Sequence, residues 1–221
     1  MPASELLPQP LPRDPMPVFE EWFRHARACR LQPNPDAMVL ASVDEQGRPS
    51  ARVVLCKHIA SHEGYIVFFT NYASRKGREL IQRPYAAVVF HWDGLHRQVR
   101  MEGRVVRSPP QESDAYFATR TLESRIGAWA SEQSAPLASR SVLQERVRQV
   151  AERFGIAPGT TQGDVPRPPH WGGFRLWIES LELWTEGAHR IHDRAVWRRN
   201  LEPRDEYSFT ASDWETTRLY P

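Results

Sequence analysis

The chain has 221 residues, a formal net charge of +2 and 40% hydrophobic residues. This length and composition are ordinary for a globular protein with a sizeable core. The nearly balanced charge argues against a general nucleic-acid-binding surface, and no apolar run approaches the roughly 18 residues that a membrane span requires.

Residues 1–16 are rich in proline and are predicted to form an extended arm. They lack the basic-then-apolar order of a secretory signal, and the two cysteines, Cys29 and Cys56, have no metal-like spacing. A reduced, cytoplasmic location is therefore expected. The arm is followed by a predicted helix over 17–29, with four apolar residues at helical spacing: Phe19, Trp22, Phe23 and Ala26.

The next part of the chain has the short apolar runs and turns of β-strands. The predicted strands are 37–43, 49–57, 64–71, 85–92 and 96–107, forming two hairpins and one further strand. A helix is predicted over 73–82, with Ser74 as a plausible N-cap.

The middle of the chain, about 108–155, is predicted to be a helical insertion. Its first helix has Ser108 as cap and Pro109 at the first position. Its last helix, 141–155, has an apolar stripe of Val142, Val147 and Val150. A loop rich in proline and glycine then leads to strands in FRLWIES, LELWTEG and HRIHDRAVW.

This order predicts a fold that is mainly β with helices, an antiparallel barrel with helices packed around it. Residues 17–221 are expected to form a single domain. Trp171, Trp177, Trp184 and Trp197 are expected to pack in the core or at an interface.

Only two of the 29 basic residues are lysines, Lys57 and Lys76. Lysine is a compact, flexible charge and arginine a planar fork, so these two positions are candidates for ligand contacts. Lys76 follows Ser74 and Arg75 at a predicted helix start, where free N–H groups and the helix dipole favour an anion. On spacing alone, the pattern favours a solvated basic turn over an anion site.

Two further patterns contain residue types suited to ligand binding, but both are also compatible with ordinary surface positions. Tyr116, Arg120 and Ser124 share one face if the segment is a continuous helix, and together they could donate hydrogen bonds to an oxyanion. A helix break in the Thr121-Leu122 region is the alternative. Arg52 and Lys57, five residues apart, would face opposite sides of a regular strand.

In the last predicted strand, Arg190, His192 and Arg194 alternate and so would point to one face. Such a row of cationic or titratable groups indicates an anionic or electron-rich partner, unless it is an ordinary surface strand. His189 and His192 would face opposite sides, and no further ligands complete a set, so no metal site is expected.

Together these segments resemble the pyridoxine (pyridoxamine) 5′-phosphate oxidase family. The resemblance is carried, in the family's order, by RVVLCK, FFTNYASRKG, RQV, the Tyr116/Arg120/Ser124 set followed by IGAW, EQS, HWGGFR, ELW and HRIHDR. It implies an FMN-binding split β-barrel that works as a homodimer, with both chains contributing to each site. The family's usual Tyr before Thr70 is Phe69 here.

The resemblance also implies the ligand residues. The expected FMN contacts are Arg52, Val53, Val54, Leu55, Lys57, Phe69, Thr70, Arg75, Lys76, Gln98, Gln133, Ser134, Trp184 and Arg194. The expected substrate contacts are Lys57, Tyr116, Arg120, Ser124, Arg190 and His192, of which Arg190 and His192 are the expected catalytic residues.

The implied reaction is oxidation of pyridoxamine or pyridoxine 5′-phosphate, the phosphorylated B6 vitamers, to pyridoxal 5′-phosphate. Oxygen would be the electron acceptor and hydrogen peroxide the by-product. Two alternatives stay open: a related flavin oxidase of the phenazine-biosynthesis type, and a non-catalytic flavin or pyridoxal-phosphate binding protein.

Overall fold

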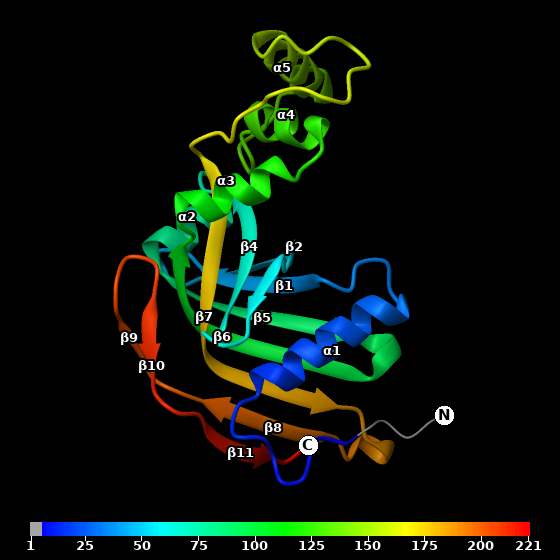
Figure 1. Ribbon diagram of the computed structural model, residues 1–221, viewed down its shortest axis with the longest axis vertical. Helices are drawn as coiled ribbons and strands as arrows, with labels where there is room; N and C mark the ends of the chain where they lie inside the picture. The colour runs from blue at the N-terminus through cyan, green and yellow to red at the C-terminus, as the bar shows by residue number, and fades with distance from the viewer. Residues whose placement is uncertain (1–5) are drawn as a thin grey trace.

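The structure is a computed structural model that describes residues 6–221 (Figure 1). The helices are α1 Met16–Cys29, α2 Arg75–Gln82, α3 Pro110–Ala118, α4 Leu122–Ala130 and α5 Arg140–Arg153, with 3₁₀ turns η1 Asp93–Leu95 and η2 Ala188–Arg190. The strands are β1 Ala37–Val43, β2 Pro49–Leu55, β3 His58–Ala60, β4 Tyr65–Asn71, β5 Tyr85–Trp92, β6 Arg97–Arg107, β7 Trp171–Thr185, β8 Asp193–Arg198, β9 Leu201–Pro203, β10 Phe209–Ala211 and β11 Glu215–Leu219.

Within residues 6–221, nine strands form one curled antiparallel sheet in the order β11-β8-β7-β6-β5-β1-β2, with β4 paired to β7 and β3 paired to β4. The small β9–β10 hairpin stands apart from this sheet. The prediction of a mainly β fold with helices packed around an antiparallel sheet is therefore confirmed.

The long strand β7 is shared by three neighbours. Along one edge it pairs with β6, and along the other with β4 over its first half and with β8 over its second half. The sequence predicted two strands, FRLWIES and LELWTEG, where the structure has one. A register shift in the β6 pairing, between Glu102 and Gly103, separates the two halves. Bulges of this kind bend a sheet, so β7 can serve two differently directed parts of the half-barrel.

The core fills the concave side of the sheet, and α1 covers it. Phe19 and Phe23 of α1 pack on Phe90 of β5, with ring centroids 5.4 and 5.9 Å apart respectively. The helical spacing of these apolar residues puts them on one face, which explains why α1 docks as predicted. Three of the four tryptophans expected to pack inside are buried, namely Trp171, Trp177 and Trp197.

The part of the proline-rich arm that the structure describes lies against the C-terminal strands. The indole of Trp197 donates to the carbonyl of Pro12 at 2.8 Å, and Leu7 is buried. The helix begins at Met16, so the arm is one residue shorter than predicted. Residues 1–5 of the predicted arm lie outside the described residues.

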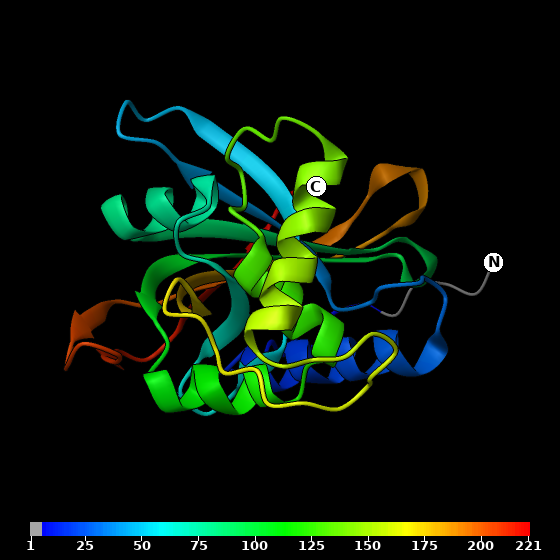
Figure 2. The same cartoon turned by 90° about the horizontal axis from the view of Figure 1, so that it is seen from above.

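The helical insertion gathers at one end of the molecule, with α5 outermost (Figures 1 and 2). The predicted apolar stripe of α5 is only partly covered, because Val142 and Val147 remain 40% and 38% exposed. The predicted caps differ slightly from the structure: α3 begins at Pro110 with Pro109 as its cap, and Ser139 caps α5. No helix of the described residues is long and apolar enough to cross a membrane.

The bulge lies at Glu179 of β7, which has no partner between the pairs Glu102–Ser180 and Gly103–Ile178, and it makes a testable demand on Gly103 of β6. A Cβ at this position would lie 1.9 Å from the carbonyl oxygen of Trp177 and 2.9 Å from the amide of Glu179, both backbone atoms. We expect Gly103→Ala to lower the free energy of unfolding by about 2–3 kcal/mol, because backbone cannot move aside as a side chain can.

Urea unfolding followed by circular dichroism measures this loss. Gly127→Ala in α4 is the matched control, because a Cβ there meets nothing within 4 Å. It should leave stability unchanged or raise it by up to about 1 kcal/mol. Equal stability of the two variants would contradict the tight approach at the bulge.

Candidate functional site

A cavity of about 470 Å³ lies between β2, the end of β4, the start of α2 and the α3–α4 segment. It brings together eleven of the residues that the sequence predicted as ligand contacts. They are Val53, Val54, Leu55, Lys57, Phe69, Thr70, Lys76, Tyr116, Arg120, Ser124 and Gln133.

The first helix N-terminus at the cavity is that of α2. As predicted, Ser74 caps it: the hydroxyl accepts from the Gly77 amide at 3.2 Å and donates to the carbonyl of Asn71 at 2.6 Å. A Cβ on Gly77 would lie 2.3 Å from the carbonyl of Tyr72, so glycine lets the helix start close against the end of β4. This turn places the positive end of the helix dipole beside the cavity.

Lys76 lines the cavity at this helix start and is only 8% exposed. Its ammonium donates to Gln133 Oε1 at 3.1 Å and to Thr70 Oγ1 at 3.3 Å, both neutral partners. Burial lowers the pKa of Lys76, and the charge of nearby Arg52 lowers it further. A buried cation with neutral partners is a position where an anionic ligand gains the most.

The second helix N-terminus is that of α4. The chain does not run as one helix through Tyr116, Arg120 and Ser124, because α3 ends at Ala118 and Thr121 caps α4 by accepting from the Ser124 amide at 3.3 Å. The prediction of a shared helical face was therefore wrong, and the alternative of a helix break near Thr121 is confirmed. The break still brings all three side chains to the cavity.

Arg120 is the second cation in the cavity without an acidic partner among the described residues. Its guanidinium lies 4.7 Å from the Trp171 ring centroid, and its Nη1 is buried with no hydrogen-bond partner. Burial lowers the pKa of Arg120. An unsatisfied buried donor is costly, so this atom is a candidate donor to a ligand.

Stacked rings form one wall of the cavity. Phe69 stacks on Tyr116 with centroids 3.9 Å apart and an 11° angle, and on Trp171 at 5.5 Å and 10°. The Phe that replaces the family's usual Tyr thus takes part in the wall through its ring. Trp171, Asn71, Gly127, Ala128 and Ser131 also line the cavity but were not predicted as contacts. Asn71 and Trp171 lie within the FFTNYASRKG and HWGGFR motifs, which could have indicated them.

Lys57 reaches the cavity from beyond the end of β2. The strand stops at Leu55, two residues earlier than predicted, because the Cys56 amide turns to the Asp36 carbonyl and the Lys57 amide to that of Val67. The ammonium of Lys57 forms an ion pair with Asp36 at 2.9 Å. Lys57 therefore has a carboxylate partner that Lys76 and Arg120 lack.

Arg52 and Arg75 lie beside the cavity rather than in its lining, and both bind Glu79. Arg52 Nη2 is 3.1 Å from Glu79 Oε2, and Arg75 Nε is 2.8 Å from Glu79 Oε1. Ser42 and Ser50 also donate to this carboxylate, at 2.5 and 2.8 Å. A buried carboxylate thus holds two of the arginines that were predicted to contact FMN.

The remaining predicted contacts form a second group far from the cavity. Gln98, Trp184 and Arg194 are direct cross-strand neighbours on β6, β7 and β8, so their side chains share one face. His192 packs on the Trp184 ring at 4.7 Å. Arg194 is held by Glu182, at 2.9 and 3.0 Å.

The predicted row of Arg190, His192 and Arg194 on one strand was wrong. Strand β8 begins only at Asp193, and Arg190 lies in η2 with a left-handed φ of 66°. The Gly187 amide donates to His192 Nδ1 at 3.2 Å, and the Ile191 amide closes a turn on Ala188. A tight turn therefore replaces the alternating strand, so only Arg194 has a strand position.

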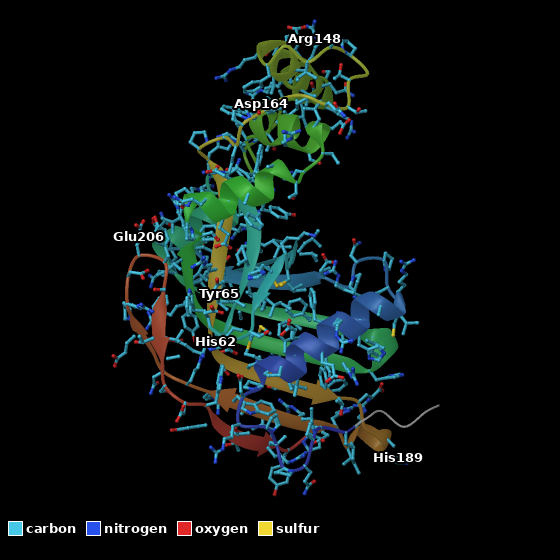
Figure 3. All side chains as sticks on the ribbon, in the orientation of Figure 1. His62, Tyr65, Arg148, Asp164, His189 and Glu206 are labelled. Carbon is cyan, nitrogen blue, oxygen red and sulfur yellow. The ribbon has the colours of Figure 1, made fainter. Side chains whose placement is uncertain are left out.

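The two groups are separated within one chain. Figure 3 shows His189, next to Arg190, at the opposite end of the molecule from α4 and α5. Ser134, with a left-handed φ of 74°, is exposed and outside the cavity lining, although its neighbour Gln133 lies in it. The described residues contain no group of three or more His, Cys, Asp or Glu that could hold a metal ion.

The cavity is thus built for a flat, anionic ligand or ligand pair. It has two helix N-termini, two cations without acidic partners and an aromatic wall. Each N-terminus with its nearby cation is a separate place for a phosphate group.

Comparisons with known proteins agree with this geometry. Residues 25–154 match a family described as pyridoxamine 5′-phosphate oxidase, and residues 171–221 match a pyridoxine 5′-phosphate oxidase C-terminal dimerisation region. A pyridoxine/pyridoxamine 5′-phosphate oxidase of Paraburkholderia phytofirmans is 50% identical over 209 residues, 95% of this chain and 90% of that protein. One of Burkholderia mallei is 50% identical over 208 residues, 94% of this chain and 89% of that protein.

Two solved structures have similar folds. PhzG from Burkholderia lata 383, in complex with tetrahydrophenazine-1-carboxylic acid, has a TM-score of 0.80 and 30% identity, covering 95% of this chain and 94% of its own. A pyridoxamine 5′-phosphate oxidase-related, FMN-binding protein from Nostoc punctiforme has a TM-score of 0.67 at 16% identity, covering 94% of this chain and 97% of its own. The expected split-barrel fold is confirmed.

The Glu79 network makes a prediction about acid stability. Burial alone would raise the pKa of Glu79, but the hydrogen bonds from two serines and two arginines outweigh it and lower the pKa from 4.5 to about 2. A carboxyl group whose pKa is lower in the folded than in the unfolded state stabilises the folded protein at pH values above its unfolded pKa. For Glu79 this contribution to the free energy of unfolding is about 3 kcal/mol at neutral pH, and it is lost as the pH falls from 4.5 through 2.

We therefore expect the free energy of unfolding of the wild-type protein to fall by about 2 kcal/mol more than that of Glu79→Gln when the pH is lowered from 6 to 3. Urea unfolding at a series of pH values measures the difference. Glu202→Gln on exposed β9 is the control, and its free energy of unfolding should depend on pH as that of the wild type does. Parallel pH profiles of the wild type and Glu79→Gln would contradict the proposed network.

Proposed function

The chain belongs to the pyridoxamine 5′-phosphate oxidase family, and on that premise we propose that it is an FMN-dependent oxidase of pyridoxamine and pyridoxine 5′-phosphate. Pyridoxal 5′-phosphate would be the product and oxygen the electron acceptor. The observation that carries this proposal is the cavity, which gathers eleven expected ligand residues around two helix N-termini. The cytoplasmic location stays a prediction.

The residues at the start of α2 fit the phosphate of FMN. Lys76 would bind it directly, because its buried ammonium lines the cavity and has only neutral partners. Arg75 would add a second charge from the first turn of the helix. When bound, FMN would supply the redox chemistry, taking a hydride from the substrate C4′ carbon and passing the electrons to oxygen to give hydrogen peroxide.

The start of α4 would hold the phosphate of the substrate. Arg120 supplies the buried donor without a partner, and Ser124 lies in the first turn of the helix. The Lys57 ammonium, which is paired with Asp36, would direct another of its N–H donors to the phosphate, and the Tyr116 hydroxyl would add a further donor. Two separate phosphate positions orient the substrate and the cofactor relative to each other, which is the main contribution that protein groups make here.

We propose that the second group completes the site of a partner chain in a homodimer. Apart from Gln98, it lies in the segment that matches the dimerisation region, and none of its residues lines the cavity of its own chain. Val39 and Val53 are cross-strand neighbours that stay 42% and 64% exposed, and Val53 also lines the cavity. This apolar surface beside the cavity suits contact with a second copy.

In such a dimer Arg190 and His192 would act on the substrate and Arg194 on FMN. His192 Nδ1 accepts from the Gly187 amide, so in the neutral ring Nε2 carries the hydrogen and can donate to a substrate oxygen or nitrogen. Arg190 would hold the reacting carbon in place with a fixed positive charge.

A second candidate is oxidation of a tricyclic acid such as the tetrahydrophenazine-1-carboxylic acid bound in the PhzG structure, which has a TM-score of 0.80 to this chain. The phosphate-binding set disfavours it. Arg120 has a buried donor beside Ser124 at a helix N-terminus, and a substrate without phosphate gives that donor no dianion to bind.

The direct test is turnover by the purified protein in air. We expect a yellow protein with about one FMN per chain that forms aldehyde absorbance and peroxide from pyridoxine 5′-phosphate, but not from unphosphorylated pyridoxine or tetrahydrophenazine-1-carboxylic acid. Arg120→Met should raise KM for pyridoxine 5′-phosphate at least about tenfold with FMN content unchanged, since a charged hydrogen bond is lost. Turnover of the tricyclic acid alone, or no uptake of added FMN, would refute the proposal.

Complementation tests whether two chains share each site. Lys57→Met damages the cavity and Arg190→Met damages the second group, and each homodimer should be nearly inactive. Co-expressed, they should regain about a quarter of wild-type activity, because half of the dimers are mixed and one of the two sites in each is then intact.

Mixing Lys57→Met with Arg120→Met is the matched control. Both lesions lie in the cavity, so every site of a mixed dimer carries one of them and no activity should return. If neither mixture regained activity, the proposal that two chains share each site would be contradicted.

A further inference from the structure

We propose that Glu79 is a positioning residue for phosphate recognition: it holds the Arg75 guanidinium in place at the first turn of α2 and balances the cations gathered there. The inference rests on the proposed function only in taking that helix start as the place where the FMN phosphate binds. Glu79 itself does not line the cavity, so it would act through Arg75.

The contacts of Glu79 leave its carboxylate little freedom. Oε1 accepts from Arg75 Nε at 2.8 Å and from Ser50 at 3.0 Å, while Oε2 accepts from Ser42, Ser50 and Arg52. The side chain is 4% exposed and lies one turn after Arg75 on α2. A carboxylate saturated by four side chains is a fixed point to which a mobile side chain can be attached.

Arg75 is the exposed side chain that Glu79 holds. It is 56% exposed and, apart from Glu79, has no side-chain partner among residues 6–221. Glu79 takes its Nε, so both terminal nitrogens stay available for a phosphate. Fixing a long, exposed side chain before the ligand arrives lowers the entropy cost of binding.

Arg52 has the opposite arrangement. Its Nη1 donates to the Leu40 carbonyl and to Ser42, and its Nη2 donates to Ser50 and Glu79. Its terminal nitrogens are therefore used within the chain, and the side chain lies outside the cavity lining. Arg52 supports the serines and the carboxylate, and Arg75 is the arginine with free donors.

The charges at this helix start also require an anion. Arg52, Arg75 and Lys76 would repel one another, and the charge of Arg52 already lowers the pKa of Lys76. Glu79 reduces the local charge from three to two positive charges, which matches a phosphate dianion. The carboxylate thus allows the cations to be held together before the ligand binds.

The experiment compares FMN with riboflavin, which lacks the phosphate, by fluorescence titration of the flavin-free full-length protein. The readout is the ratio of the riboflavin Kd to the FMN Kd. Glu79→Gln, which loses the charge, and Glu79→Asp, which keeps the charge but shortens the reach, should each lower this ratio about tenfold. Riboflavin affinity should stay within about twofold of the wild type.

A double mutant shows whether Glu79 acts through Arg75. Arg75→Met alone should lower the ratio at least as much as Glu79→Gln does. Adding Glu79→Gln to Arg75→Met should then change the ratio by less than about twofold. Glu112→Gln is the matched control, because it removes the carboxylate of another partly buried ion pair, with Arg175 at 2.6 Å, outside the cavity.

Three results would overturn the inference. An unchanged or higher ratio in Glu79→Gln would mean that the carboxylate only repels the phosphate. A full effect of Glu79→Gln in the Arg75→Met background would mean that it acts on the fold. A wild-type protein that does not prefer FMN to riboflavin would refute the proposed cofactor as well, whereas wild-type preference with unaffected variants refutes this inference alone. If Glu79→Gln does not fold, Glu79→Asp and exposed Arg75→Met still decide the outcome.

Discussion

The shared strand β7 is the constraint on which the rest of this structure depends. Because it pairs with β6 along most of its length, with β4 at one end and with β8 at the other, it joins these three strands and their neighbours into one sheet. The β4 end carries the cavity, and the β8 end carries Trp184 and Arg194. A strand of 15 residues keeps these ends apart, since each residue adds about 3.3 Å. One chain therefore cannot bring its two groups of ligand residues together, which is the physical reason for proposing a dimer.

The placement of carboxylates divides the cations of the site into two kinds. Lys76 and Arg120 face the cavity with neutral or aromatic neighbours, so their charge is available to a ligand. Arg75 and Arg194 are held by Glu79 and Glu182, which fix their direction but leave them near their proposed targets. Binding sites for phosphorylated aromatic molecules need both kinds, one to bind the phosphate and one to hold its geometry.

Local patterns predicted much of the fold and many of the site residues. The strands 37–43 and 85–92 were predicted with their observed bounds, and Ser74 was predicted as a cap. These features depend on nearest neighbours in the chain, such as alternation on a pleated strand and a side-chain acceptor at a helix start. The excess of arginine also made Lys57 and Lys76 conspicuous, and both line the cavity.

The sequence by itself determined the type of each long element and, through its resemblance to a family, the list of residues to look for, including the two motifs proposed to bind phosphate. Only the tertiary structure decided how those residues are grouped. It replaced the predicted row at Arg190 and His192 with a turn, and it showed Glu79 between the two arginines. Such features depend on contacts between residues far apart in the chain, as when Ser42 and Ser50 meet Glu79 on a helix about 30 residues later. Local periodicity contains no information about those contacts, because they arise only when the sheet curls and α2 packs beside it.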